Sequence, residues 1–531
     1  MKKQIGHVIS GSLSEGLAMR IDSQVTLETI KTGKFVSILG GHHKYFSLIT
    51  DLALALSNPD ILVFPPTEQE SLLFNFLKEK DMYATAQLKP MLMLGKDNRP
   101  VPVKTIPPHF APVVEVSNAD VALIFGDEDD PSKRYFNVGC PIDMTTPVCL
   151  NLDRLTERSN GIFGKTGTGK TFLTRLVLAG LIKNEKAVNL IFDMHGEYGL
   201  QARKEGYNES FVKGLKTLFP DKVAIFSLDP QSTRRRGGMA DVEVNLSYQD
   251  VNVEDILSLQ SELNLHSTAL EAAYLIAAKY KRNWLQALLE KGDNPKDFAQ
   301  ELGAHPESIA ALFRKLKRIE RLSFFNSSNL NNSVIDQMME YITKGKHIII
   351  EFGNYSSTFV YLLIANIITR RIHAEYVAKT EKFLGSHNKE DEPKKLLITI
   401  EEAHKFLNTS AAQQTIFGTI AREMRKYYVS LLIIDQRPSG IDPEIISQIG
   451  TKIIAQLNDE KDIQAVLSGT NANNFKPILA SLDSKKQVLL VGHAVAMPVV
   501  IETREYNEEF YKAMNQFIVR KTSKEIIEEI F

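Results

Sequence analysis

The first 145 residues alternate short apolar runs with clusters of glycine and proline. Strands are expected at residues 6–10, 35–39, 61–64, 113–116 and 121–125, and one helix is expected near residues 45–56. Many short strands separated by turn residues predict a small β-barrel or a β-sandwich. We therefore assign residues 1–145 to an N-terminal β domain.

From residue 146 the pattern changes to near-continuous apolar runs that alternate with helical stretches. The runs lie at residues 161–163, 188–192, 223–226, 348–352, 396–400, 431–434, 453–457 and 488–491. Apolar strands separated by helices predict an α/β fold whose parallel sheet is covered on both faces. Residues 146–239 and 340–505 would form this core. A charged helical insertion would occupy residues 240–339, and residues 506–531 would form a C-terminal helical arm.

Composition and charge narrow the class of protein. The 531 residues are 43% hydrophobic, which excludes a disordered or collagen-like chain. The 63 basic and 64 acidic side chains give a net charge of −1, which argues against coating nucleic acid by bulk charge but leaves room for a local basic channel. Two cysteines and the lack of a signal peptide or of 18 consecutive apolar residues predict a cytoplasmic protein with no membrane partner.

The strongest chemical signal is a GxxxxGK[ST] match placed between an apolar strand and a helical stretch. Its residues are Gly164, Lys165, Thr166, Gly167, Thr168, Gly169, Lys170 and Thr171. Glycines let backbone amides curl around phosphate oxygens at a helix N-terminus, where the helix dipole also favours negative charge. Lys170 would reach the β- and γ-phosphates and Thr171 would hold Mg²⁺. This segment predicts a nucleoside triphosphate site.

Carboxylates follow two of the predicted strands. Glu401 and Glu402 end the run at residues 396–400, and in open α/β sheets ligands gather at the carboxyl ends of the strands. We expect Glu401 to face the water shell of Mg²⁺ and Glu402 to polarise the attacking water. Asp193 follows the run at residues 188–192. It could approach the Mg²⁺ or the water, or it could cap the next turn.

Polar residues around the run at residues 431–434 complete the predicted site. Gln436 stands at the end of this strand, next to the strand that carries the two glutamates, and could sense the γ-phosphate. Arg422 and Arg425 precede the strand on a helix. They could form a solvated or salt-bridged face, or one of them could reach the nucleotide of a neighbouring subunit.

The sequence resembles the HerA helicases of the HerA–FtsK branch of P-loop ATPases. The segments that carry the resemblance are GKTGTGKT, IFDMHGEYG, LLITIEEAHKFL and AREMRKYYVSLLIIDQRPSG. It covers roughly residues 150 to 505 apart from the insertion, and IGHVISGS near the start is similar to the small β-barrel that precedes the HerA core. Two departures are Met424, where a glycine is common, and Glu401 in place of the more general aspartate.

The resemblance implies a RecA-like core in a hexameric ring that hydrolyses ATP and translocates double-stranded DNA. It further implies a separate partner, either a NurA-like nuclease in DNA-end processing or a defence effector. By position, Lys170 and Thr171 would be the Walker A pair and Glu401 and Glu402 the Walker B pair. Gln436 would be the sensor. The same positions make Arg422 or Arg425 the arginine that acts in trans, and place Arg158 near the nucleotide.

A ring that encloses DNA needs basic groups at its pore, contacting phosphates without reading bases. Arg234, Arg235 and Arg236, followed by Gly237-Gly238, would form a flexible basic loop, and Lys405 is a second candidate. A solvated surface loop is the alternative. Two other functions stay open: a hexameric scaffold that assembles and regulates an effector enzyme, and a secretion-type ATPase, which is weaker because no membrane segment is present.

Overall fold

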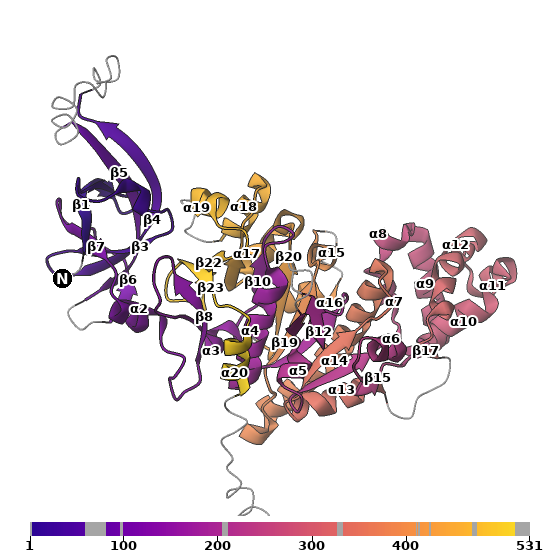
Figure 1. Ribbon diagram of the computed structural model, residues 1–531. Helices are drawn as coiled ribbons and strands as arrows, with labels where there is room; N and C mark the ends of the chain where they lie inside the picture. The colour runs from indigo at the N-terminus through magenta and orange to yellow at the C-terminus, as the bar shows by residue number, and fades with distance from the viewer. Residues whose placement is uncertain are drawn as a thin grey trace, which may run out of the picture. The chain divides into compact units, whose positions relative to one another are not determined.

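The computed structural model describes residues 3–58, 81–95, 99–203, 211–326, 333–409, 411–412, 415–423, 426–469 and 475–515. The chain divides into two compact units. Unit 1 comprises Met1–Leu155, Ile162–Lys170 and Gly450–Glu505, and unit 2 comprises Thr156–Gly161, Thr171–Ile449 and Tyr506–Phe531. Helices and strands of both are labelled in Figure 1. The domain boundaries expected from the sequence remain a proposal.

The N-terminal part of unit 1 is a closed β-barrel. Its sheet has the order β2-β1-β7-β3-β4-β5-β6, and the additional pairing of β2 with β5 closes it. Alternating buried side chains such as Val36, Ile38 and Ile49 fill the interior, as expected where one face of each strand points inward. The strands are β1 (Gln4–Ser12), β2 (Gly16–Ile21), β3 (Phe35–Leu39), β4 (Lys44–Leu56), β5 (Met82–Leu94), β6 (Pro100–Pro102) and β7 (Pro112–Glu115).

Two expectations for this part were wrong. Residues 45–56 are strand and not helix, because β4 pairs with β3 along one edge and with β5 along the other. Residues 121–125 belong to helix α2 (Asn118–Phe125), whose N-cap Ser117 forms a capping box with Asp120. Residues 61–64, expected as a strand, lie outside the described residues.

The rest of unit 1 contains antiparallel strands in the order β21-β22-β23-β8-β9. Their bounds are β8 (Tyr135–Pro141), β9 (Val148–Asn151), β21 (Thr451–Ile454), β22 (Gln487–Gly492) and β23 (Val499–Thr503). Strand β10 (Asn160–Phe163) leads into the glycine-rich loop, and the amide of Ala455 donates to the carbonyl of Phe163 at 2.8 Å. This pairing fixes the start of the loop.

Unit 2 is built on parallel strands in the order β15-β14-β18-β11-β19-β20. Asp193 at the end of β11 lies opposite Glu351 at the end of β18, and Glu401 ends β19, so carboxylates meet at one edge of the sheet. This confirms the predicted α/β fold with a parallel sheet. The runs at residues 453–457 and 488–491 were also expected in that sheet, which was wrong for their pairing, because β21 and β22 pair antiparallel. The bounds are β11 (Val188–Asp193), β14 (Val223–Ser227), β15 (Val242–Glu243), β18 (His347–Glu351), β19 (Leu396–Glu401) and β20 (Val429–Asp435).

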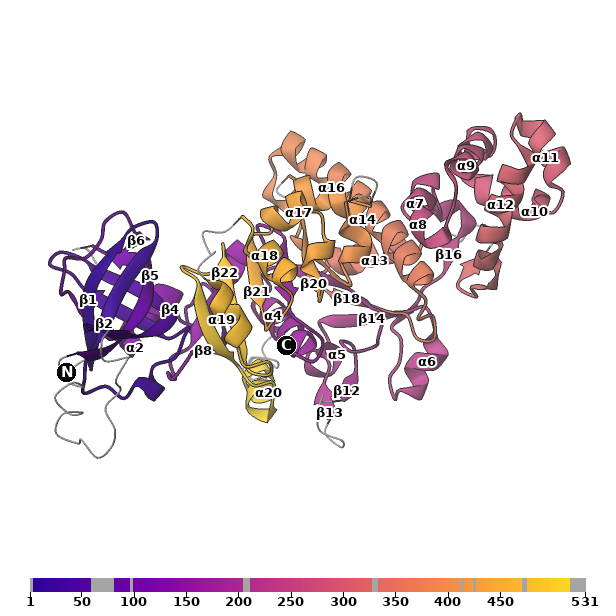
Figure 2. The same ribbon diagram turned by 90° about the horizontal axis from the view of Figure 1, so that it is seen from above.

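Helices lie on both sides of these strands (Figure 2). They bury the apolar strand residues from the two faces, as the near-continuous hydrophobic runs predict. The helices are α4 (Lys170–Asn184), α5 (Leu215–Leu218), α6 (Pro230–Arg235), α13 (Val334–Thr343), α14 (Thr358–Ser386), α15 (His404–Leu407), α16 (Ile416–Glu423), α17 (Pro443–Gln448) and α20 (Glu508–Asn515). Among the described residues, none of the helices has both the length and the apolar character that a membrane crossing requires.

Between β15 and α13 the chain forms a group of short helices that pack on one another (Figures 1 and 2). Trp284 is 2% exposed and its Nε1 donates to the carbonyl of Val251 at 2.7 Å, so it is a packing residue. The helices are α7 (Val253–Leu257), α8 (Gln260–Leu263), α9 (Ser267–Tyr280), α10 (Trp284–Lys291), α11 (Pro295–Leu302) and α12 (Pro306–Leu316).

Buried His347 gives the fold a predicted dependence on pH. Its Nδ1 accepts the amide of Asn189 at 3.0 Å, and burial lowers its pKa from 6.5 to about 3. The neutral imidazole therefore stabilises the fold above pH 6.5, and this contribution is lost as the pH falls towards 3, by up to about 1.4 kcal/mol per pH unit. We expect the melting temperature of the wild type to fall more steeply between pH 7.5 and 5 than that of His347→Gln.

Replacement of the exposed His42 by glutamine is the control for removing a histidine, and it should leave the steep pH dependence in place. Equal slopes for the wild type and His347→Gln would contradict the prediction.

Candidate active site

The glycine-rich loop joins β10 to the first turn of α4. Gly167 and Gly169 have φ angles of +79° and +80°, a region that L side chains rarely adopt, although a Cβ would meet nothing within 4 Å at either position. Glycine is therefore required by the backbone turn and not by lack of space. Lys170 Nζ and Thr168 Oγ1 donate to the carbonyl of Lys165 at 2.9 and 2.8 Å. The loop is curled at a helix N-terminus, the arrangement that suits a phosphate chain.

Helix α4 holds the turn that follows β11. Thr171 Oγ1 donates to Glu197 Oε2 at 2.9 Å. Arg175, which is 2% exposed, donates its Nε to the backbone carbonyl of Glu197 at 2.9 Å. Sequence reasoning assigned a role to neither Glu197 nor Arg175. The signal was present, because Arg175 is a single arginine in the apolar stretch TFLTRLVLAGLI, one helical turn after Thr171.

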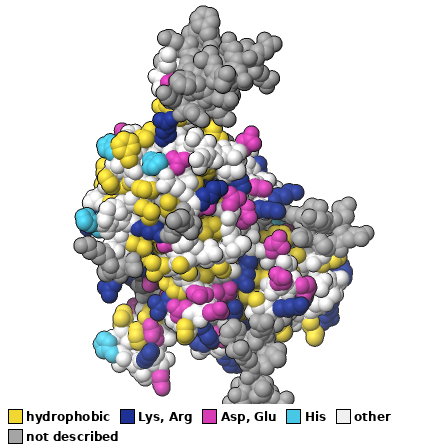
Figure 3. All heavy atoms as spheres, turned by 60° about the vertical axis from the view of Figure 1, so that its left-hand side comes forward, with side chains coloured by type: hydrophobic (Ala, Val, Ile, Leu, Met, Phe, Trp, Pro, Cys, Tyr) yellow, Lys and Arg dark blue, Asp and Glu magenta, His cyan; other side chains and the backbone are white. Residues whose placement is uncertain are grey.

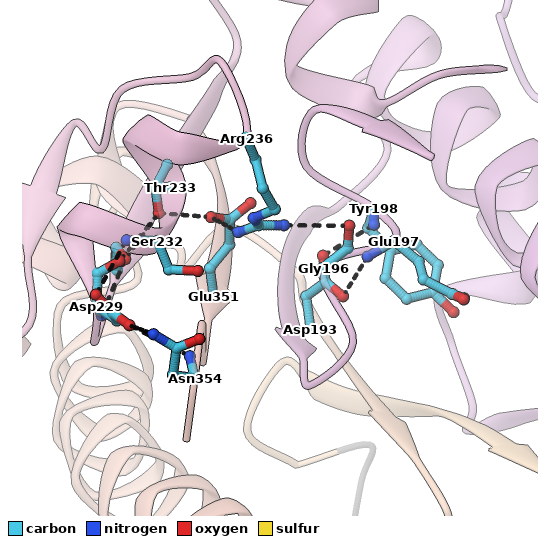
Figure 4. A network of polar contacts seen from close by, with 11 residues as sticks. Asp193, Gly196, Glu197, Tyr198, Asp229, Ser232, Thr233, Arg236, Glu351 and Asn354 are labelled. Carbon is cyan, nitrogen blue, oxygen red and sulfur yellow. Dashed lines mark hydrogen bonds and ion pairs between the residues drawn. The ribbon is translucent and has the colours of Figure 1, made fainter. Parts of the chain in front are cut away.

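Asp193 makes the contacts of a turn cap (Figure 4). Its Oδ1 accepts the amide of Glu197 and its Oδ2 accepts the amide of Tyr198, each at 2.8 Å. The side chain is fully buried, and burial raises its pKa. Of the two roles that the sequence left open, these contacts correspond to the cap. A role towards nucleotide or metal stays a prediction.

Glu401 lies partly buried at the end of β19, with its two carboxylate oxygens in different environments. Oε1 accepts the hydroxyl of Tyr198 at 2.7 Å. Within the described part of the chain Oε2 is buried and has no hydrogen-bond partner. Burial raises the pKa of Glu401 to about 8. An orphaned acceptor at a strand end fits a donor such as a water ligand of Mg²⁺, which is usually bound through few carboxylates together with substrate phosphates.

Glu402 follows directly and is held in an unusual backbone conformation, with a φ of +51°. Gln436 Nε2 donates to Glu402 Oε1 at 3.3 Å, so the structure brings the predicted sensor and the predicted base together. On the other side, His404 Nε2 lies 3.8 Å from Glu402 Oε2, and His404 Nδ1 lies 3.0 Å from Asp435 Oδ2. The hydrogen bond with Asp435 raises the pKa of His404. Sequence reasoning missed His404 and Asp435, although both stand at strand ends beside assigned residues.

The predicted arginines lie in different settings. Arg422 Nη1 donates to the carbonyl of Ala412 at 3.0 Å, and its Nε lies 3.5 Å from Glu444. Arg158 is partly buried, and its Nε is a buried donor without a hydrogen-bond partner in the described part of the chain. Arg425 lies outside the described residues, as does Met424.

The first two arginines of the basic segment are helical, which corrects the expected flexible loop at these positions. Arg234 and Arg235 are the exposed last residues of α6, which starts at N-cap Asp229 followed by Pro230. Aspartate before proline is an ordinary helix start, so the sequence carried this signal. Arg236 forms an ion pair with the buried Glu351.

The other basic candidate, Lys405, lies in α15. Its Nζ is 3.4 Å from Thr358 Oγ1, the atom to which it donates.

The glycine-rich loop, the parallel sheet and the carboxylates at its strand ends define a P-loop ATPase. Comparison with known proteins narrows this class. Residues 136–372 match the family described as "Helicase HerA, central domain". This match and the similarity to HerA helicases support a HerA-type ATPase, an ATP hydrolase of the helicase type.

Similar proteins span most of the chain. The DNA double-strand break repair helicase HerA of Sulfurisphaera tokodaii is 25% identical over 99% of this chain and 98% of its own length. The protein of the same name from Pyrococcus furiosus is 23% identical over 68% of each chain. Similar solved structures are VirB4 of Thermoanaerobacter pseudethanolicus (TM-score 0.45, 14% identity, 71% of this chain and 98% of that one) and the bacterial conjugative coupling protein TrwB (TM-score 0.48, 12% identity, 74% and 92%).

Proposed function

We propose that this ATPase assembles into a homo-hexameric ring and uses ATP hydrolysis to move double-stranded DNA. The observation that carries the hydrolytic part is the contact of Glu402 with Gln436 at the ends of neighbouring strands, beside Glu401 with its orphaned oxygen. The names of the HerA relatives, which are DNA double-strand break repair helicases, support DNA as the substrate.

In the proposed reaction Lys170 contacts the β- and γ-phosphates, and Gly164–Lys170 supplies backbone amides to the phosphate chain. Mg²⁺, which neutralises phosphate charge, would be held by Thr171 and, through water, by Glu401. For Thr171 this requires its hydroxyl to leave Glu197.

Glu402 accepts the proton of the attacking water, and Gln436 orients that water next to the γ-phosphate. Asp435 holds His404 in place, and the His404 ring lies 3.8 Å from the second carboxylate oxygen of Glu402. Arg158 would meet the nucleotide, and Arg422 or Arg425 would reach the nucleotide of the neighbouring subunit.

A ring places its DNA contacts at the pore, so the rest of its surface need not be basic. The face in Figure 3 agrees with this proposal, since acidic and basic side chains are intermixed over it. We propose Arg234 and Arg235 as phosphate contacts because both are exposed at the end of α6. Lys405 is a weaker candidate because it contacts Thr358. A separate nuclease or defence effector would supply any further chemistry.

ATP hydrolysis with and without duplex DNA tests the proposal. We expect duplex DNA to raise kcat, and we expect this stimulation to disappear in Glu402→Gln. If duplex DNA does not change the rate of ATP hydrolysis, and the protein forms a stable ring with a bound effector enzyme, the result would instead favour a scaffold that assembles the effector.

The salt dependence of DNA binding tests the two arginines. The double variant Arg234→Ala/Arg235→Ala should bind duplex DNA more weakly, and the slope of log K against log salt should flatten by about 0.9 for each lost phosphate contact. The control Arg314→Ala/Lys315→Ala removes the same charge from exposed positions of α12. An unchanged slope in the first variant would show that the arginines of α6 do not contact DNA phosphates.

A further inference from the structure

Arg236 forms an ion pair inside unit 2 although it follows two exposed arginines (Figure 4). Its Nη2 lies 2.5 Å from Glu351 Oε2, and the hydroxyl of Thr233 donates to the same oxygen at 2.9 Å. The side chain of Glu351 is fully buried, whereas that of Arg236 is 32% exposed. The guanidinium therefore reaches from the surface to a carboxylate that water does not contact.

Glu351 needs this partner because it is one of two buried carboxylates on neighbouring strands. It lies in register with Asp193 across the pairing of β18 with β11. Asp193 is compensated by two backbone amides, but Glu351 Oε1 is buried without a hydrogen-bond partner in the described part of the chain. Burial raises the pKa of Glu351, and the charge of Arg236 acts against this rise. Removing the arginine would leave a buried carboxylate with the Thr233 hydroxyl as a donor but without a compensating charge.

The second contact of Arg236 is with the turn after β11. Its Nη1 donates to the carbonyl of Gly196 at 3.3 Å. Gly196 has a φ of +69°, and a Cβ added to it would lie 2.1 Å from the same Nη1. The guanidinium thus rests directly on the glycine, and even the smallest side chain at this position would displace it.

The turn that Arg236 contacts continues into the candidate active site. The next residue, Glu197, accepts the hydroxyl of Thr171, which is the predicted Mg²⁺ ligand of the phosphate loop. The residue after it, Tyr198, donates to Glu401. One turn therefore links the guanidinium to both residues that we propose for the metal.

We infer that Arg236 is a positioning residue for ATP hydrolysis. Anchored on Glu351, it holds the Gly196 carbonyl and thereby sets where Glu197 and Tyr198 present their side chains to Thr171 and Glu401. The inference concerns the ATPase reaction alone, so it stands or falls independently of the proposed DNA substrate.

The basal ATPase activity of the full chain provides the first test. We expect Arg236→Ala to lower kcat by about 10- to 100-fold, the size of effect that a misplacement of about 1 Å produces, with a smaller change in KM for ATP. The control Arg282→Ala removes an exposed arginine from the group of short helices between β15 and α13, and it should keep the wild-type kcat.

A double variant separates positioning from simple charge compensation. Arg236→Gln/Glu351→Gln removes both charges, so no carboxylate is left without a compensating charge. The melting temperature of this double variant should therefore lie close to that of the wild type. We expect its kcat to stay low, because the Gly196 carbonyl has lost its guanidinium. Recovery of wild-type kcat in the double variant would show that Arg236 only neutralises Glu351, and wild-type kcat in Arg236→Ala would equally overturn the inference.

Discussion

Replacing Glu402 by glutamine is expected to lower kcat for ATP hydrolysis by about 100- to 10,000-fold, the range that a general base contributes. Glutamine keeps the size of the side chain and can still contact Gln436, but it cannot accept the proton of the attacking water. The affinity for ATP should change little, because in the proposed site the phosphate loop makes the phosphate contacts. Phosphate release under steady state, together with titration of a fluorescent ATP analogue, measures the two quantities.

Glu271→Gln is the matched control, since it makes the same chemical change at an exposed position of α9. It should hydrolyse ATP as the wild type does. A fall in kcat of only a few fold in Glu402→Gln would mean that another group activates the water, and the pairing of Glu402 with Gln436 would then need another explanation.

Replacing Lys170 by alanine should have the complementary effect and weaken ATP binding itself. The lysine would supply a charge-assisted hydrogen bond to the phosphates, and the loss of such a bond corresponds to about 1.5–3 kcal/mol, or about 10- to 150-fold in affinity. Its Nζ donates to the Lys165 carbonyl, which places the ammonium over the curled loop. Titration of the same ATP analogue measures this change.

Lys296→Ala, at an exposed position of α11, controls for the loss of one positive charge. Unchanged affinity in Lys170→Ala would contradict the assignment of the loop as the phosphate site. Together the two variants separate binding from chemistry: Glu402→Gln should bind without hydrolysing, whereas Lys170→Ala should fail at binding.

The parallel sheet could be predicted from the sequence because its strands are buried on both faces. The run at residues 188–192 became β11 (Val188–Asp193), and the run at residues 396–400 became β19 (Leu396–Glu401). Near-continuous apolar runs leave little ambiguity once helices separate them. In the barrel the same reasoning failed at β4, because the pairing of that strand with β3 and β5 overrode its local propensity.

Some parts of the candidate site could be predicted from the sequence and others could not. The phosphate loop and the Glu401–Glu402 pair could be found because their spacing along the chain carries the chemistry. The contacts of Tyr198 with Glu401 and of Arg236 with Glu351 could not, since 203 and 115 residues separate the partners. These partners meet only through the order β18-β11-β19 in the sheet, which no local pattern specifies.

We propose that ATP hydrolysis drives this protein along double-stranded DNA. Displacement of a third strand from a duplex tests this most directly, because a motor that tracks the duplex removes the third strand without separating the two strands beneath it. We predict release that requires ATP and is lost in Glu402→Gln, while Glu271→Gln releases the strand at the wild-type rate. ATP hydrolysis at full rate on the same duplex, with no release of the third strand, would contradict translocation.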